Sequence, residues 1–501
     1  MKHEKLAAVD LGSNSFHLQI GRVVDDQIYL LDGLRDPVQL GAGFTRDRCI
    51  DRTTQLRALD ALGRFGERLR GFPKGAVRAV GTNALRVARN AEQFLMEAEQ
   101  VLGYPVEVVF GKEEARLIYL GVANSLRPSS EGRLVVDVGG GSTEFIIGTG
   151  LTPDLMESVS MGCVSFSLRF FPQGALDKQN FKRAELAAAN EIERFVKPFR
   201  RAGWAHAVAS SGTARTVAAI LRGFGWCERG INAQGLAQLR SYMIKAGEIG
   251  TLYLPDIRAD RLQVLAGGVA ILNAVFSELC IESMDVSDSA LRQGVLYDLL
   301  GRVSHHDLRE ATVSHFQRRY HVDVAQSERV AAMAESIHAQ IAVDPAEDDL
   351  LVLRWAAALN EIGISISHAG YHKHSAYVLS QADMPGFSQH EQARLSRIVL
   401  AHRGKLGKRE LEGLPARSAD WPLIFSLRVA ALFCRSRNEI QFPKLRANTT
   451  ETGFQLALPF GWLEEHSLTQ AALDEEAEEW NVLGMTLELR SYAEERQNAA
   501  G

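Results

Sequence analysis

A short motif occurs twice in this chain of 501 residues. Residues 9–21 align without a gap with residues 136–148, and each copy contains an apolar strand, an Asp, a turn rich in Gly and Ser, and a second strand. Glycine lets backbone N–H groups come close to an anion, and consecutive turned N–H groups form an anion-binding nest. Asp10 and Asp137 occupy equivalent positions. The repeat predicts two hairpins that hold a chain of phosphates from opposite sides.

The two Asp residues indicate a metal ion between the hairpins. A carboxylate does not contact phosphate favourably by itself, but Mg²⁺ usually binds through one or two carboxylates, waters and substrate phosphates. The alternative is a pair of unrelated hairpins, because Asp-x-Gly is common in turns. The recurrence of Asp, Gly and the hydrophobic pattern in register favours the phosphate-binding interpretation.

Composition excludes several classes of protein. With 46% hydrophobic and 23% charged residues the chain can bury a large core. Its net charge of −5 argues against general nucleic-acid binding. Five scattered cysteines without metal-ligand spacing indicate a reducing compartment, the cytoplasm. The first strand is expected from about Lys5, which leaves no room for a signal peptide. Polar residues interrupt the longest apolar stretch, 264–281, which predicts a buried helix and no membrane span.

The order of predicted elements repeats in the first 300 residues. The first series has strands at 6–9, 16–24 and 28–34, then a helix at 53–70, a strand at 76–80, a helix at 91–102, a strand at 106–110 and a helix from 112. The second series has strands at 133–138, 143–148 and 205–210 and helices at 183–200 and 236–249. Two related α/β lobes of this kind predict the actin-like (RNase H-like) architecture with a ligand cleft between the lobes, and two unrelated domains are the alternative.

Beyond about residue 300 the pattern becomes helical. Helical stripes dominate from 308 to about 406, followed by a helix at 424–437 and strands at 444–448, 453–457 and 485–489. An acidic helix at 473–480 is expected to present a solvated face. The predicted domains are therefore lobe I at 1–122, lobe II at 123–303, an all-α domain at 304–412 and a small α+β domain at 413–501.

Two predicted strand-to-helix turns carry polar residues that suit phosphate chemistry. In the first, Glu113 and Glu114 open a helix, where one can cap the helix and the other can activate water in the cleft; the residues alone do not tell which. In the second, Thr82 is expected to cap a helix whose N–H groups form another anion site. Arg86 either clamps phosphate or is solvated, with equal weight. A third turn, at 210–213, is a weaker signal.

Seven motifs resemble one family. AAVDLGSNSFHLQIG, GTNALR, GKEEARLIY, LVVDVGGGSTEFIIG, SMGCVSF, SSGT and ALRQGVLYDLL occur in the order found in the exopolyphosphatase / guanosine pentaphosphate phosphohydrolase family. They span residues 7 to about 300. Residues 353–379 resemble the helical region of the longer, four-domain members, so the resemblance covers almost the whole chain.

The resemblance implies that terminal phosphates are hydrolysed from inorganic polyphosphate with Mg²⁺, that K⁺ is a candidate activator, and that the protein is a homodimer. It implies Glu114 as the catalytic base and Asp137 and Glu144 as acidic residues near the metal, with Asp10 on the opposite hairpin. Attack by water is favoured over a phospho-enzyme on Asp10. The phosphate-binding residues expected from the turns and the resemblance together are Ser13, Asn14, Ser15, Thr82, Arg86, Gly139, Gly140, Gly141 and Ser142.

The all-α region resembles an HD-type phosphohydrolase domain, which binds metal through a His-Asp pair. Asn360 and Glu361 stand in that place, and an amide is a poor substitute for imidazole at a transition metal. We therefore expect a scaffold and a substrate channel, with His368, His372, His374 and His402 structural or in contact with phosphate. The candidate channel residues, for which a solvated basic face is an equal alternative, are Lys373, His374, Arg403, Lys405, Lys408, Arg435 and Arg437.

Three other functions are alternatives to an exopolyphosphatase. The first is a phosphatase that converts guanosine pentaphosphate to guanosine tetraphosphate. Full length and a basic C-terminal region favour the polymer, which gains from many weak contacts, and no base pocket is evident. The second is a non-catalytic sensor of polyphosphate or alarmone, which the intact EEAR motif disfavours. The third is a sugar kinase on the actin-like scaffold, for which no adenine-binding signature is evident.

Overall fold

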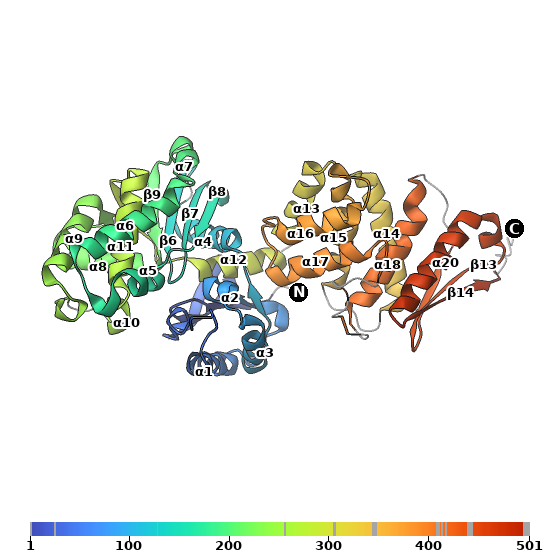
Figure 1. Cartoon of the computed structure of the whole chain (residues 1–501), viewed down its shortest axis with the longest axis horizontal. Helices are drawn as coiled ribbons and strands as arrows, with labels where there is room; N and C mark the ends of the chain where they lie inside the picture. The colour runs from blue at the N-terminus through green and yellow to red at the C-terminus, as the bar shows by residue number, and fades with distance from the viewer. Residues whose placement is uncertain are drawn as a thin grey trace. The chain divides into compact units, whose positions relative to one another are not determined.

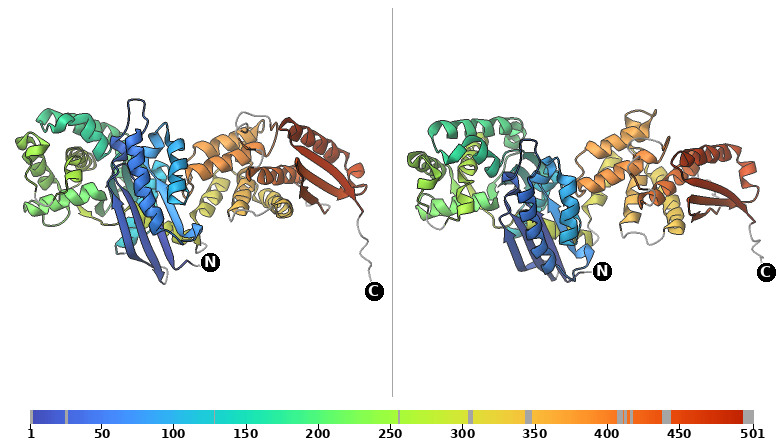
Figure 2. Two further views of the ribbon diagram at one scale, coloured as in Figure 1. Left: turned by 90° about the horizontal axis from the view of Figure 1, so that it is seen from below. Right: turned by 60° about the horizontal axis from the view of Figure 1, so that its bottom comes forward.

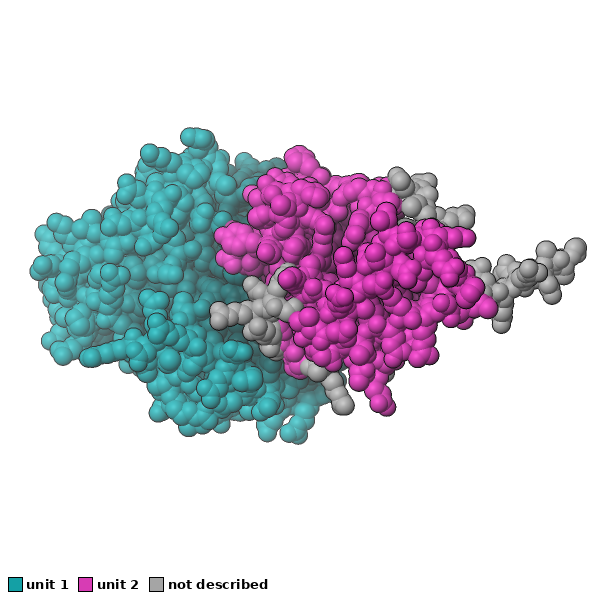
Figure 3. All heavy atoms as spheres, turned by 45° about the vertical axis from the view of Figure 1, so that its right-hand side comes forward, with its two compact units in different colours: residues 1–308, 385–389 teal, residues 309–384, 390–501 magenta. Residues whose placement is uncertain are grey.

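The computed structural model describes residues 3–24, 27–127, 129–254, 257–303, 307–342, 348–406, 411, 414–415, 418–437 and 444–493 (Figure 1). The chain divides into two compact units, coloured separately in Figure 3. The first unit contains residues 1–308 and 385–389, and the second contains residues 309–384 and 390–501. Among the described residues, no helix is both long and apolar enough to cross a bilayer.

The first lobe is built on a five-stranded sheet with the order β3-β2-β1-β4-β5. The three strands that form an antiparallel meander lie side by side in Figure 2, namely β1 (Lys5–Leu11), β2 (Phe16–Val24) and β3 (Gln27–Asp36). The strands β4 (Val77–Gly81) and β5 (Val106–Val108) extend the sheet in parallel beyond β1. The predicted strands of this lobe are confirmed.

Both faces of this sheet are covered, as the apolar sequence of β1 requires. Because successive side chains of a strand point to opposite faces, Val9 and Ala8 enter different cores. Val9 packs with residues of α1 (Arg52–Arg68) and α3 (Ala91–Leu102). Ala8 packs with residues of α4 (Gly111–Ser125) and α12 (Leu291–Val303). The helix α1 begins where the Asp51 side chain accepts a hydrogen bond from the backbone N–H of Thr54 at 2.8 Å.

The second lobe repeats the topology of the first. Its sheet has the order β10-β11-β9-β6-β7-β8, of which β8-β7-β6-β9-β11 matches β3-β2-β1-β4-β5 strand for strand. The strands are β6 (Arg133–Val138), β7 (Thr143–Thr149), β8 (Thr152–Val159), β9 (His206–Ser210), β10 (Ile231–Asn232) and β11 (Ser283–Val286). The predicted actin-like architecture of two related lobes is confirmed.

The helices of the second lobe gather beside its sheet in Figure 1. They are α5 (Cys163–Phe170), α6 (Lys178–Glu193), α7 (Val196–Ala202), α8 (Ser211–Gly223), α9 (Ala233–Ala246), α10 (Ala259–Leu262) and α11 (Leu265–Leu279). The stretch predicted as a buried helix is α11, whose residues join the lobe's core.

One helix prediction was wrong. The single helix expected at 183–200 is two helices, because the chain breaks between α6 and α7. Pro198 has no backbone N–H, and in an uninterrupted helix its ring would clash with the carbonyl of Arg194. The break places Pro198 in the first turn of α7, where proline is tolerated.

The helices α4 and α12 cross at two glycines. A Cβ atom on Gly294 would lie 1.7 Å from the carbonyl oxygen of Leu117, and one on Gly121 would lie 2.2 Å from that of Ala290. Neither position can hold a larger residue unless the helices separate. The crossing therefore fixes how α4, which carries Glu113 and Glu114, sits against α12.

The second unit is helical, with a small sheet near its end. Its longer helices are α13 (Leu308–Arg319), α14 (Val324–Ile341), α15 (Asp349–Leu359), α16 (Tyr371–Gln381), α17 (Gln389–Ala401), α18 (Asp420–Phe433) and α20 (Ser467–Val482). The sheet contains β12 (Arg446–Thr449), β13 (Gly453–Pro459) and β14 (Thr486–Tyr492) in that order. Phe425 of α18 stacks on Phe454 of β13 with ring centroids 4.3 Å apart. The finer division into four domains stays a prediction.

The acidic helix is not only a solvated face. Glu476 of α20 is buried, where its carboxylate accepts hydrogen bonds from the Arg428 guanidinium and, at 2.8 Å, from the Trp480 indole N–H. A buried carboxylate is tolerated when it is paired in this way. The expectation of a solvated face was therefore wrong at Glu476.

Candidate active site

The two repeated hairpins face each other across a cleft of about 140 Å³. A Cβ atom on Gly140 would lie 3.1 Å from the Cβ of Ser13, so the turns of the two hairpins nearly touch. Of the residues predicted to contact phosphate, metal or water, the cleft is lined by Asp10, Ser13, Asn14, Ser15, Thr82, Glu114, Asp137, Gly139, Gly140, Gly141 and Ser142. Arg86 and Glu144 lie just behind this lining.

Strand register explains why the two hairpins differ in chemistry. In the first hairpin Asp10 is paired with His17, whereas in the second Asp137 is paired with Glu144. The equivalent position therefore carries an imidazole in one hairpin and a carboxylate in the other. The Ser210 hydroxyl donates to Asp137, and the Ser158 hydroxyl donates to Glu144 at 2.9 Å. These bonds hold both carboxylates of the second hairpin in place.

Three carboxyl groups of the site are buried, and each has a raised pKa. Desolvation, opposed by Arg292 and assisted by the charges of Glu114 and Asp137, raises the pKa of Asp10 to about 7. Desolvation likewise raises the pKa of Asp137 to about 6. The pKa of Glu144 lies well above its usual range because of desolvation and the neighbouring charges of Glu114 and Asp137. A cluster of mutually repelling carboxylates is costly in a folded protein and points to a function.

The structure separates the two glutamates at the start of α4. Glu114 lines the cleft. Glu113 points elsewhere, where its carboxylate accepts hydrogen bonds from Arg116 and from the backbone N–H of Gly386. Neither side chain caps the helix, because Phe110 stands at the N-cap without a side-chain bond. Of these two glutamates, Glu114 is the one placed to meet a water in the cleft.

Arg86 is bound to this glutamate. Its guanidinium donates to the Glu114 carboxylate at 2.7 Å and to the carbonyl oxygen of Val109 at 3.0 Å. Both bonds use one terminal nitrogen, which leaves the other N–H groups of the side chain as donors. Thr82 stands at the N-cap of α2 (Asn83–Val87), but its side chain makes no capping bond. The prediction that Thr82 caps this helix was therefore wrong, and Thr82 lines the cleft instead.

Two side chains in the cleft carry buried polar atoms without a partner. The Oδ1 atom of Asp10 and both amide atoms of Asn14 are buried and have no hydrogen-bond partner. Buried polar atoms of this kind cost free energy unless a ligand or water satisfies them. The described residues contain no preassembled cluster of three or more His, Cys, Asp or Glu side chains with metal-binding geometry. A free carboxylate oxygen beside other carboxylates fits Mg²⁺, which takes few protein ligands and completes its shell with water and phosphate.

Sequence reasoning missed an arginine-rich pocket beside the cleft. This pocket of about 400 Å³ is lined by Arg35, Arg215, Arg258, Arg261 and Arg292, together with His17. Three of these arginines, namely Arg215, Arg261 and Arg292, also line the cleft. Desolvation and the charges of Arg35 and Arg215 lower the pKa of Arg261 and of Arg292. We call these five side chains the arginine cluster.

His17 is neutral within this cluster. Desolvation and the nearby positive charges, Arg292 first, lower its pKa to about 2. The unprotonated Nδ1 atom accepts a hydrogen bond from Arg292 at 3.2 Å. Arg35 donates to the Ser15 hydroxyl at 3.1 Å and to Asp260 at 2.6 Å, and so links the first hairpin to the second lobe. Arg292 stands in a recognisable motif, but nothing in the sequence around Arg261 or Arg35 indicated that they converge.

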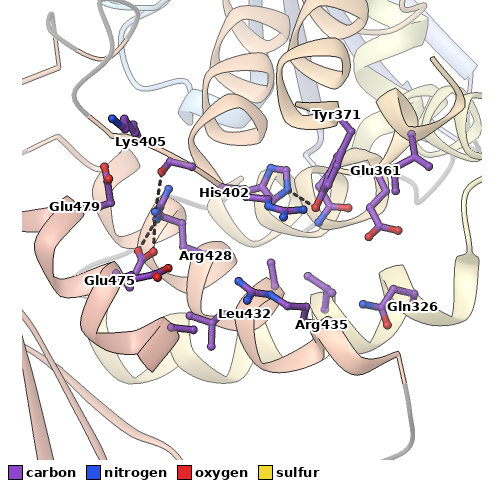
Figure 4. Close-up of a pocket in the computed structure, with 18 of the residues that line it drawn as sticks. Gln326, Glu361, Tyr371, His402, Lys405, Arg428, Leu432, Arg435, Glu475 and Glu479 are labelled. Atoms are coloured by element: carbon purple, nitrogen blue, oxygen red, sulfur yellow. Dashed lines mark hydrogen bonds and ion pairs between the residues drawn. The ribbon is translucent and has the colours of Figure 1, made fainter. Parts of the chain in front are cut away.

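The second unit contains a separate pocket of about 500 Å³, shown in Figure 4. Four of the seven predicted channel residues line it, namely Arg403, Lys405, Arg435 and Arg437. Lys373 and His374 do not, and Lys408 lies outside the described residues. Glu475, Glu478 and Glu479 of α20 line it as well, so the pocket carries charges of both signs. Arg437 is paired with Glu361 at 2.7 Å.

One histidine of this pocket, His402, makes contacts typical of a structural group. His402 is buried, and desolvation lowers its pKa to about 3. Its Nδ1 atom lies 2.6 Å from the carbonyl oxygen of Val399 and its Nε2 atom 3.5 Å from the Tyr371 hydroxyl. Figure 4 shows His402 pointing toward Tyr371. Asn360 and Glu361, which the resemblance aligns with the metal-binding His-Asp pair of HD domains, line this pocket.

The fold and the site together define an actin-like protein in which the two repeated hairpins face each other across a cleft lined by carboxylates. A crystal structure of an exopolyphosphatase from Cytophaga hutchinsonii shares this fold at 24% identity and a TM-score of 0.55, covering 60% of this chain and 98% of that one. The PPX-GPPA enzyme of Aquifex aeolicus is 26% identical with a TM-score of 0.50, and the match covers 58% of this chain and 98% of that one.

Sequence profiles match most of the chain. The profile of the Ppx/GppA phosphatase family matches residues 19–303, and that of domain III of Ppx/GppA phosphatases matches residues 308–477. The chain belongs to the Ppx/GppA phosphatase family. It is therefore a phosphatase, and the predicted resemblance is confirmed.

Proposed function

We propose that this phosphatase is an exopolyphosphatase, which hydrolyses the terminal phosphate of inorganic polyphosphate. The observation that carries the proposal is the arginine cluster, which continues from the carboxylate cleft into a second pocket. One phosphate would lie between the hairpins, and those that follow it would lie among the arginines. Among the described residues that line the arginine pocket there is no Phe, Tyr or Trp. A run of phosphates suits such a lining better than a nucleobase does.

The proposed chemistry needs positioning and charge neutralisation, which is the usual demand of phosphoryl transfer. Glu114 accepts a proton from water while the new O–P bond forms and the bridging P–O bond breaks, leaving a chain shorter by one phosphate. Arg86 holds the Glu114 carboxylate toward the cleft. Asp10, Asp137 and Glu144 would hold Mg²⁺, which when bound neutralises charge on the phosphate oxygens. Asn14 and the turn N–H groups of 139–142 would bind the terminal phosphate.

A second substrate is favoured by a further pocket. A space of about 420 Å³ shares Asn14 with the cleft, and no charged residue is found among the described residues that line it. Phe171 offers an apolar ring, and Gln39, Gln173 and Gln263 offer amides that can pair with the edge of a base. Guanosine pentaphosphate, with its base in this pocket, is therefore our second candidate substrate.

The same proposal includes the surroundings of the enzyme. We place it in the cytoplasm as a homodimer, with K⁺ as a candidate activator. All five cysteines are free thiols, which supports a reducing compartment.

The test is phosphate release by the full chain with Mg²⁺ from long-chain polyphosphate and, separately, from guanosine pentaphosphate. We expect Glu114→Gln to lower kcat about 1,000-fold, because general-base catalysis contributes roughly 100- to 10,000-fold. Glu92→Gln is the matched control, since Glu92 is an exposed acid in the first turn of α3. Undiminished activity of Glu114→Gln would remove the base assignment, and no release from either substrate would favour a sensor.

A further inference from the structure

A closed ring of hydrogen bonds joins α4, α12 and the short segment Pro385–Gln389 beside the proposed base. The segment belongs to the first unit, although the sequence on both sides of it belongs to the second unit. In the ring, Glu113 accepts from the backbone N–H of Gly386 at 2.9 Å. Arg302 donates to the carbonyl oxygen of Gly386 at 2.7 Å. Both polar groups of one glycine are thus held by charged side chains.

Two further side chains close the ring. Arg116 donates to Glu113 through two nitrogens, at 2.8 and 2.7 Å, and also to Asp298. Asp298 in turn accepts from Arg302 at 3.1 Å. The order around the ring is therefore Gly386, Glu113, Arg116, Asp298 and Arg302, which leads back to Gly386.

Most of the ring is buried. The side chains of Glu113, Arg116 and Asp298 are 3%, 8% and 6% exposed. Burial alone raises the pKa of Asp298, but the charges of Arg116, Arg78 and Arg302 outweigh it and hold the pKa well below its usual range. Two carboxylates face two guanidiniums within the ring, so its charges balance. A buried network that is fully paired is rigid, and loss of one member leaves a charge uncompensated.

This ring determines the position of the first turn of α4. Glu113 and Glu114 are consecutive residues, so any shift of the turn that carries Glu113 moves Glu114 by a similar distance. The glycine contacts at Gly121 and Gly294 prevent α4 from sliding along α12 farther down. A misplacement of about 1 Å in a reacting group can cost about 100-fold in rate. The polar ring and the glycine crossing together hold the first turn of α4 in one position.

We propose that Glu113 and Gly386 are positioning residues for the base Glu114, and that the segment Pro385–Gln389 acts on catalysis through them. This inference rests on the proposed hydrolysis with Glu114 as base. Neither residue lines the cleft among its described residues. Because these two residues lie outside that lining, a change in the backbone of the segment is expected to alter the rate of the chemical step without altering substrate affinity. The sequence of the segment continues directly into the second unit at both ends.

The variant Gly386→Ala tests this in the full chain. Gly386 has φ +90, a conformation that a residue with a Cβ atom rarely adopts, so the substitution strains the backbone that makes both bonds. We expect kcat on long-chain polyphosphate to fall about tenfold with KM within twofold. The matched control is Gly370→Ala, because Gly370 has φ +68 and a Cβ there would meet nothing closer than 4.0 Å. It carries similar strain but no link to α4.

A second variant and a second measurement separate positioning from folding and from the proposed function. Glu113→Gln is expected to lower kcat, and Glu113→Asp to lower it less, because Asp keeps a carboxylate that can pair with Arg116 and Gln does not. Amide hydrogen exchange of residues 111–116 is expected to rise in Gly386→Ala and not in Gly370→Ala. Equal kcat and equal exchange in the two glycine variants would overturn the inference. If the unsubstituted chain releases no phosphate, the proposed function fails, and the exchange data alone still decide whether Gly386 fixes the turn.

Discussion

The cleft of the first unit and the pocket of the second unit arrange charge in opposite ways. In the cleft, charges are grouped by sign, with Asp10, Asp137 and Glu144 on the hairpins and the arginine cluster beside them, although Arg86 is paired with Glu114 and Arg35 with Asp260. In the second unit, opposite charges are paired. Arg428 holds Glu476, and Arg437 holds Glu361. The first arrangement raises carboxyl pKa values and lowers guanidinium pKa values, as expected of mutual repulsion and burial.

This difference in charge arrangement indicates which of the two pockets is suited to bind a charged ligand. Paired charges satisfy each other and gain little from an added ion. Segregated charges are destabilising until an ion of opposite sign arrives, so a fold that retains them has another use for them. We therefore expect the proposed metal-bound polyanion to bind in the cleft. The pocket of the second unit has already used much of its charge to hold its own helices together.

The largest effect is expected from Mg²⁺ as a function of pH. The folded-state pKa of Asp10 is about 7, above its ordinary 3.8, so its contribution to stability is present below pH 3.8 and is lost as pH rises through 7. The loss amounts to about 4 kcal/mol for a shift of this size. At the proposed site Mg²⁺ would bind the ionised carboxylates, so we expect it to raise Tm much more at pH 8 than at pH 5.

Differential scanning calorimetry of the full chain with and without Mg²⁺ at the two pH values makes this measurement. Asp137→Asn is the informative variant, because it should lose most of the Mg²⁺-dependent shift at pH 8. An equal shift at both pH values, or one that survives in this variant, would place the stabilising ion outside the cleft.

A smaller effect of opposite sign is expected in the second unit. The pKa of His402 is about 3 in the folded protein, below its ordinary 6.5, so the folded state holds it neutral while the unfolded chain takes up a proton. Its contribution to stability is present above pH 6.5 and is lost as pH falls toward 3. At pH 4 the loss is about 3 kcal/mol.

The variant His402→Gln should therefore lose less stability between pH 7 and pH 4 than the unsubstituted chain, by about 3 kcal/mol. Urea unfolding at the two pH values measures it. A pH dependence identical to that of the unsubstituted chain would show that His402 titrates normally. His315 lies on α13 outside the described residues that line the pocket, and His315→Gln serves as the matched control.

The two units also differ in how much the sequence predicted. Local repetition disclosed the hairpins, because the Asp, Gly and Ser of each hairpin lie within a few residues of one another, and the repeated succession of strands and helices along the chain predicted two related lobes. The arginine cluster was missed because its members come from β3, α8, α12 and the residues before α11, and only the folded chain brings them together. Long side chains that converge from distant elements leave no periodic signal in the sequence.

The same limit applies to choosing between adjacent residues. Glu113 and Glu114 have equal helix propensity and charge, and the structure separates them only because Arg116, which is itself bound to Asp298, and the backbone N–H of Gly386 donate to Glu113. The acidic helix was judged by its composition, but one of its glutamates turned inward to a buried arginine. The helix break before Pro198 was readable from the sequence, since proline in a helix interior carries a known cost.

The smallest of the three effects compares one arginine from each unit. Arg261 lines both the cleft and the arginine pocket, and the groups that act on its pKa are Arg35, Cys163, Asp260 and Arg215. Arg437 already has two carboxylate partners, Glu361 and Asp323. A charge-assisted hydrogen bond is worth about 1.5–3 kcal/mol, so we expect Arg261→Ala to raise KM for polyphosphate about 30-fold.

For Arg437→Ala we expect a rise in KM below threefold, because a phosphate would have to displace Glu361 before it gained this charge. Initial rates of phosphate release over a range of long-chain polyphosphate concentrations give both values, at one fixed salt concentration because screening weakens such contacts. The comparison between the units is reversed if Arg437→Ala has the larger effect. In that case the paired charges of the second unit would be the ones that exchange their partners for substrate, and the segregated charges of the cleft would serve the metal alone.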